Sequence, residues 1–184
     1  NKKDIKQAID GVDGVVHLAA IVGDPACAKE PDVAKETNWQ ASKNLYDLCV
    51  ENENVERFVF ASTCSNYGKM EDQEYVYEES ELRPVSLYAE LKVKFEKYLL
   101  ESDTDDDLYS TSMRFATAYG LSPRPRFDLT VNDFTRQLYD EKELVIYGEQ
   151  FWRPYCHVRD IANSIEIVLN SSEELIDNEV YGVG

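Results

Sequence analysis

The chain has 184 residues, of which 43% are hydrophobic and 30% charged, and its 19 basic and 36 acidic residues give a formal net charge of −17. A protein this negative is disfavoured as a partner of nucleic acid or of anionic membranes. Because no apolar run approaches the length of a membrane span and no signal-peptide pattern is present, we expect a soluble, cytoplasmic protein.

Strand-like and helix-like segments alternate along the sequence. One predicted helix has an apolar face that includes Ala34, Leu45 and Leu48, and a later one has a stripe that includes Leu91 and Phe95. Alternation of this kind predicts a parallel sheet with helices on both faces. The expected elements are, in chain order, strand 12–18, helix 31–51, strand 57–62, helix 86–102, strand 110–116, helix 129–140, short strand 144–147, helix 160–170 and strand 179–183.

Two acidic stretches lie between these elements. Residues 64–85 are interpreted as a long, mobile surface loop near the functional site, and residues 103–107 as a solvated turn.

A hydroxyl pair and a tyrosine–lysine pair point to proton transfer. Ser62 and Thr63 end an apolar strand, while Tyr88 and Lys92 follow on a helix whose entry is marked by Pro84. A phenol with a pKa of about 10 is a poor base, but an ammonium one helical turn away on the same face stabilises the phenolate and lowers that pKa. A Tyr-x-x-x-Lys pair alone would be common by chance. The hydroxyls of Ser62 and Thr63, which precede this pair, favour a proton-transfer site for hydride chemistry on an alcohol or ketone.

Three strand ends are expected to meet at this proton-transfer site. Ala19-Ala20, Ser62-Thr63 and 115–117 each follow a strand directly. Ligands of open α/β sheets bind beyond the carboxyl ends of the strands. The spacing therefore predicts one site at that edge, shared with Tyr88 and Lys92.

The remaining chemically versatile side chains are interpreted as structural. His17 and His157 lie in apolar stretches, Asn38 is placed to support adjoining strands, and Cys64 is expected to be a small packing residue. With two histidines, four cysteines and no Cys-x-x-Cys pair, we expect reduced thiols and no metal site.

Five further segments, 15–20, 60–68, 88–92, 114–120 and 152–160, follow one another in the order of a known family. Through them the chain resembles the extended short-chain dehydrogenase/reductase family, the NAD(P)-dependent nucleotide-sugar epimerases, dehydratases and reductases. The resemblance implies a Rossmann-like, doubly wound parallel sheet that is incomplete, plus part of a small substrate-binding region. It divides the chain into a partial NAD(P)-binding domain, 1–121, and a partial substrate-binding region, 122–184.

The resemblance also implies roles for individual residues, with NAD or NADP as the cofactor and a nucleotide-diphosphate sugar as the substrate. Thr63, Tyr88 and Lys92 would be catalytic. The cofactor would contact Ala19, Ala20, Ala61, Ser62, Tyr88, Lys92 and Phe115. The substrate would contact Thr63, Thr117, Thr130, Val131 and Arg153. Arg124 and Arg159 are expected to pair with surface carboxylates instead.

Departures from the family pattern narrow these expectations. Sugar 4,6-dehydratases carry Asp-Glu directly after the threonine, whereas Cys64 and Ser65 stand here, so dehydration is disfavoured. Thr117 stands where many members have an asparagine that contacts the substrate, so the resemblance does not define the sugar pocket. The glycine-rich phosphate turn of the family is absent, because Gly11 and Gly14 precede a strand instead of following one.

The chain is accordingly expected to be a fragment, truncated at both ends and inactive alone. In the family the strand around Val15 pairs with the first strand of the domain, so its open edge predicts a homo-oligomer or a segment-exchanged dimer. The leading hypothesis is a nucleotide-sugar epimerase or a related reductase. The alternative is a non-catalytic binding or assembly module, and Tyr88→Phe in the complete protein would separate the two.

Overall fold

The computed structural model describes residues 1–69, 75–102, 108–140, 142–150 and 152–184. Its main sheet is parallel and has the order β1 (Gly14–His17), β2 (Arg57–Thr63), β3 (Tyr109–Phe115) and β6 (Glu179–Val183). A second, two-stranded parallel sheet joins β4 (Thr117–Tyr119) to β5 (Tyr155–His157). The predicted parallel α/β architecture is confirmed.

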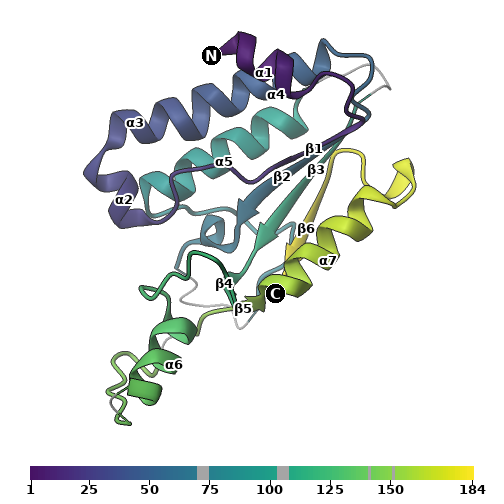
Figure 1. Cartoon of the computed structure of the whole chain (residues 1–184). Coiled ribbons are helices and arrows are strands. Elements are labelled where there is room, and N and C mark those ends of the chain that lie inside the picture. The colour runs from purple at the N-terminus through teal and green to yellow at the C-terminus, as the bar shows by residue number, and fades with distance from the viewer. Residues whose placement is uncertain (70–74, 103–107, 141, 151) are drawn as a thin grey trace.

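Helices cover the two faces of the main sheet (Figure 1). One face carries α4 (Ser42–Val50) and α5 (Leu87–Leu100), and the other carries α7 (Val158–Leu169). α6 (Thr130–Asp140) lies away from the main sheet and buries none of its residues. The remaining helices are α1 (Lys2–Ala8), α2 (Asp24–Lys29) and α3 (Pro31–Lys35), a π-helical turn at Glu36–Ala41, and 3-10 turns at Cys64–Tyr67 and Glu173–Leu175.

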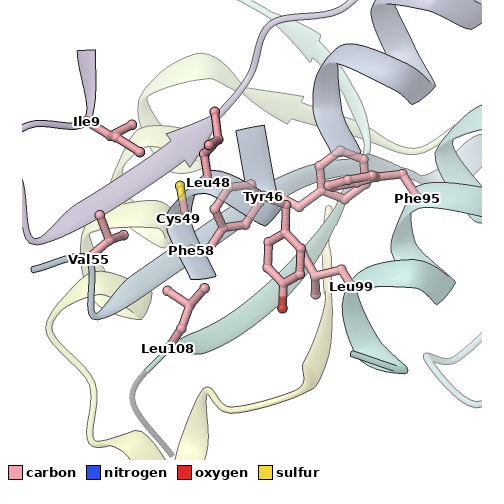
Figure 2. Packing of buried hydrophobic residues seen from close by; sticks show 10 residues of the cluster. Ile9, Tyr46, Leu48, Cys49, Val55, Phe58, Phe95, Leu99 and Leu108 are labelled. Carbon is pink, nitrogen blue, oxygen red and sulfur yellow. The ribbon is translucent and has the colours of Figure 1, made fainter. Parts of the chain in front are cut away.

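The period of two along β2 divides the core between these faces. Phe58 and Phe60 point into the cluster under α4 and α5, while Val59 points to the cluster under α7. Figure 2 shows the first cluster, in which the rings of Tyr46 and Phe58 meet edge to face with centroids 5.0 Å apart. Aromatic pairs in this arrangement add to the stabilisation from area burial.

Several predicted elements need correction. Helix 31–51 is divided by the π-helical turn, and α1, α2, β4 and β5 were not predicted. The predicted strand 144–147 is wrong: these residues form no strand, and Val145, Ile146 and Tyr147 are exposed. A short apolar run resembles a strand by pattern alone, but a strand also needs a neighbour with which to pair its backbone.

Of the two acidic stretches, one lies partly and the other wholly outside the residues that the structure describes. The segment 64–85 opens with a 3-10 turn, and its residues 70–74 are outside the described residues, as is the predicted turn at 103–107. In the part of the chain that is described, no helix has both the length and the apolar character needed to cross a membrane. No three metal-ligating side chains gather there either.

Candidate active site

A cavity of about 530 Å³ opens at the carboxyl ends of β2 and β3. Thr63, Tyr88 and Lys92 all line it, as the sequence predicts. Tyr88 and Lys92 follow Thr63 by 25 and 29 residues along the chain. Further predicted residues on its wall are Ala61, Ser62, Phe115 and Thr117.

Local capping interactions place the hydroxyl and the phenol. Thr63 ends β2, and its Oγ1 accepts a hydrogen bond from the Ser65 amide at 3.2 Å, which starts the 3-10 turn. Ser86 caps α5: its Oγ accepts from the Ala89 amide at 3.3 Å and donates to Asp24 Oδ1 at 2.6 Å. Tyr88 therefore sits in the first turn of α5, with its side chain at the cavity.

Lys92 lies one turn further along α5 and is only 4% exposed. Its Nζ donates to the Ala61 carbonyl at 2.6 Å and lies 4.6 Å from the centroid of the Phe60 ring. Burial lowers the pKa of Lys92 to about 8. Among the described residues no carboxylate forms an ion pair with this ammonium, so N–H donors remain for a ligand.

The phenol of Tyr88 does not behave as the spacing predicted. Burial raises its pKa to about 12, and the hydrogen bond with Thr63 opposes this rise. The ammonium of Lys92 is 5.9 Å from the ring centroid and donates to the Ala61 carbonyl, and burial of the phenol decides the direction of the shift. The expected lowering of the Tyr88 pKa by Lys92 is therefore wrong for the chain in this state. Tyr88 and Thr63 both line the cavity, and Thr63 opposes the rise in the Tyr88 pKa.

Positive charge reaches the cavity from the segment 122–126, which follows β4. Arg124 and Arg126 both line the wall. Arg126 forms an ion pair with Asp128 at 2.5 Å. Arg124 and Arg159 have no carboxylate partner among the described residues, so their predicted surface pairing is not observed there. Arg124 is thus a cationic donor at the cavity of a strongly acidic protein.

Other predicted contact residues lie outside this cavity. Ala19 and Ala20 stand between two residues that line it, Leu18 and Val22, without lining it themselves. Thr130 lines a separate cavity of about 340 Å³ beside α6, and Val131 lines neither cavity.

Arg153 also lines neither cavity, but its charge acts on a residue of the first one. Burial raises the pKa of Cys64, and the charge of Arg153 opposes that rise. A half-buried thiol with a raised pKa is a poor nucleophile, in keeping with the packing role expected for Cys64.

Two cavity residues were missed because their contacts are distant in sequence. Asp24 begins α2, its charge adds to the rise of the Tyr88 pKa, and it accepts from Ser86 across 62 residues. Asn132 on α6 accepts from the Gly120 amide at 3.4 Å. No local pattern marks either contact.

The residues interpreted as structural hold that role. His17 is 8% exposed, its Nε2 is 2.8 Å from Ser42 Oγ, and burial lowers its pKa to about 4. The Asn38 side chain pairs with both backbone groups of Ile21, accepting at 2.8 Å and donating at 2.9 Å. His157 caps α7 by accepting from the Arg159 amide.

The whole chain, residues 1–184, matches the model of a family described as the NAD dependent epimerase/dehydratase family. Over 168 residues it is 33% identical to an uncharacterized UDP-glucose epimerase, YtcB, of Bacillus subtilis (strain 168), with 90% of this chain and 52% of that protein covered. The chain spans about half the length of the curated relatives it matches.

Solved structures agree with this match. The UDP-glucose 4-epimerase of Thermotoga maritima with UDP-glucose has a TM-score of 0.86 at 25% identity, with 100% of this chain and 60% of that chain covered. The UDP-glucuronic acid 4-epimerase of Bacillus cereus in complex with UDP-glucuronic acid and NAD has a TM-score of 0.84 at 26% identity, with 98% and 56% covered.

Proposed function

Because this chain belongs to the NAD dependent epimerase/dehydratase family, within the extended short-chain dehydrogenases/reductases, we propose that the whole protein is a nucleotide-sugar epimerase or a related reductase. One observation carries the proposal: Thr63, Tyr88 and Lys92 meet at a single cavity beyond the strand ends of a Rossmann-like sheet. We also propose that the chain by itself does not turn over substrate, and that it divides into a cofactor domain, 1–121, and a substrate region, 122–184.

The chemistry assigned to these residues is proton transfer at a sugar carbinol. Tyr88, as phenolate, would accept the proton of the sugar hydroxyl, and Thr63 would donate to the oxygen as it becomes a ketone. Bound NAD supplies the hydride acceptor and donor. Lys92 would add positive charge near the phenolate and a donor to the cofactor.

The residues at the cavity fit a dinucleotide of this kind. Ala61, Ser62 and Phe115 form the strand-end wall, and Lys92 keeps N–H donors beyond the one used by Ala61. The family is NAD-dependent, and a neighbouring structure contains NAD, so NAD is proposed before NADP. Ala19 and Ala20 are kept as proposed contacts on the adjoining segment.

A nucleotide-diphosphate sugar is the proposed substrate. Structural neighbours bind UDP-glucose and UDP-glucuronic acid, and Arg124 offers a guanidinium without a carboxylate partner in the described part of the chain. Thr117 is the proposed contact to the sugar within the cavity. Thr130, Val131 and Arg153 remain proposed contacts to the nucleotide from the surrounding elements.

Elimination of water is not part of the proposed reaction. Cys64 and Ser65 stand where a dehydratase carries its acid and base, and burial raises the pKa of the Cys64 thiol. Neither side chain can supply a carboxylic acid.

The decisive experiment uses the whole protein with NAD and a set of UDP-sugars that includes UDP-glucose and UDP-glucuronic acid. NMR of the products should show inversion of one carbinol centre, and Tyr88→Phe should lower the rate by roughly 100-fold to 10,000-fold. The matched control is Tyr139→Phe, since Tyr139 is 83% exposed on α6. Unchanged turnover in Tyr88→Phe would reject the catalytic role of Tyr88, and no turnover of any of these substrates by the whole protein would favour a binding or assembly module.

A further inference from the structure

The segment of residues 75–86, called the strap here, runs from the described side of the long loop to the cap of α5. Three of its apolar side chains, Tyr75, Tyr77 and Val85, are 70%, 64% and 66% exposed, while Val76 and Leu82 are half-buried. Its anchors are polar and involve Glu78 and Arg83: the Arg83 amide donates to the Asn66 carbonyl at 3.0 Å.

Glu78 is fixed from two sides. Its backbone carbonyl accepts from Arg114 Nη1 at 2.8 Å, and its carboxylate accepts from the Gly182 amide at 2.6 Å. Arg114 and Gly182 are register partners on β3 and β6. Glu78 thus bridges two neighbouring strands at one level of the sheet.

Gly182 is needed for this approach. A Cβ at this position would lie 2.9 Å from Glu78 Oε1, closer than real Cβ contacts come. Gly184, two residues later on the chain, differs: a Cβ there would make ordinary contacts of 3.7 Å to Ala116 and 3.9 Å to Pro154.

Arg114 connects the strap to the parts that carry the candidate site. Its Nη2 donates to Glu96 Oε1 at 2.7 Å on α5, one turn beyond Lys92. Its Nη1 also donates to Tyr67 Oη at 2.9 Å, in the 3-10 turn that directly follows Thr63. One buried guanidinium therefore contacts the strap, the helix of Tyr88 and the turn beside Thr63.

We propose that Glu78 is a positioning residue: by seating its carboxylate on the Gly182 amide it holds the strap, and through the strap and Arg114 it fixes the position of Tyr88 beside Thr63 in the cavity. The strap leads into α5 at Ser86, two residues before Tyr88. This inference does not depend on the proposed reaction, because it concerns the geometry of the free chain.

The test compares variants of the chain itself. Glu78→Ala removes the acceptor, and Gly182→Ala displaces it by steric conflict. The matched controls are Glu79→Ala, a neighbouring exposed carboxylate, and Gly184→Ala. Glu78→Gln keeps a carbonyl oxygen that can accept from the Gly182 amide and should restore the geometry.

Two measurements decide the outcome. Hydrogen exchange at the Arg83 amide should become faster by about tenfold or more in Glu78→Ala and in Gly182→Ala, but stay within about twofold in both controls. Carbon-13 NMR of labelled tyrosine should show a shifted or broadened Tyr88 resonance in the same two variants, assigned by its absence from Tyr88→Phe. The variant that combines Glu78→Ala with Gly182→Ala should show the same exchange rate and the same Tyr88 resonance as either single variant, because each change breaks the same hydrogen bond.

Other outcomes overturn the proposal. Unchanged exchange at Arg83 would show that the contact does not hold the strap. Faster exchange with an unmoved Tyr88 resonance would show that the strap does not position the phenol. If Gly182→Ala loses its cooperative unfolding transition, the exchange and NMR measurements on Glu78→Ala and Glu78→Gln decide the test, because neither substitution changes β6. Loss of that transition in Glu78→Ala would make the contact one of global stability and would also reject the positioning role.

Discussion

Tyr88 is a residue at which burial and hydrogen bonding act in opposite directions. Burial raises the pKa of its phenol to about 12, while the Thr63 hydroxyl stabilises the phenolate and lowers that pKa. In the free chain the phenol is therefore neutral at physiological pH. Any use of Tyr88 as a base requires a further interaction that favours the charged form.

We predict that Thr63→Val raises the pKa of Tyr88 further, because it removes the hydrogen bond that opposes burial. Absorbance titration of tyrosinate, taken as the difference from the same protein with Tyr88→Phe, should show no Tyr88 signal below about pH 11 in either protein. A Tyr88 pKa that stays the same or falls in Thr63→Val would contradict this account.

His17 should make the stability of the chain depend on pH. Burial, with a smaller effect from the charge of Lys92, lowers its pKa from 6.5 to about 4. Between these values the unfolded chain binds a proton that the folded chain does not bind. The contribution of neutral His17 is therefore complete above pH 6.5 and is lost as pH falls toward 4, by about 3 kcal/mol in all.

The measurement is the free energy of unfolding from urea titrations across this pH range, with His17→Gln for comparison. Carboxylates titrate in both proteins, so the difference between the two curves isolates the imidazole. We expect the variant to have the flatter profile. Parallel profiles would show that His17 is not buried in its neutral form.

At the scale of elements, the contact between α5 and β3 depends on a buried ion pair. Arg114 and Glu96 are 5% and 1% exposed, and Ser112 Oγ adds a hydrogen bond to Glu96 Oε2 at 2.7 Å. Removing one partner leaves the other charge buried and uncompensated. The energetic cost of such a change exceeds the net stabilisation by the pair itself.

Glu96→Ala should lower the free energy of unfolding by about 3–5 kcal/mol. The control Glu90→Ala, on the exposed side of α5, should change it by no more than about 0.5 kcal/mol. Replacing Glu96 and Arg114 together by leucine should cost less than the sum of the two single changes. Strict additivity in urea denaturation would contradict the coupling between these helix and strand residues.

Elements with strong periodicity were predictable, and contacts between distant elements were not. Strand 57–62 and helix 86–102 match β2 and α5 closely because their apolar spacing reflects burial in the core. The meeting of Thr63, Tyr88 and Lys92 followed from the rule for strand ends. The raised pKa of Tyr88 could not be predicted, since burial depends on tertiary packing. The Glu78–Gly182 contact has no local signal either.

At the scale of the whole molecule, β1 is a strand at the edge of the main sheet. Within the described residues it pairs only with β2, so backbone groups on its other side are available. The net charge of −17 opposes the approach of a second copy. Association through this edge is therefore a balance between strand pairing and repulsion.

We predict that the chain self-associates in sedimentation experiments, and that association strengthens as salt screens the repulsion. Leu18→Lys, directly after β1, should weaken it, whereas Leu175→Lys should not, although both leucines are similarly exposed at 55% and 59%. A single monomeric species at high protein and salt concentration would rule out pairing through β1.

The anchor between Glu78 and Gly182 joins residues 104 positions apart, and its donor lies on the last strand of the chain. During synthesis, the helix that carries Tyr88 leaves the ribosome well before β6 does. Contacts of such long sequence separation form late, because the intervening loop must close first. A nascent chain can thus acquire its aromatic core early, but if Glu78 positions Tyr88 as proposed, Tyr88 and Thr63 reach their final geometry only after translation has passed residue 182.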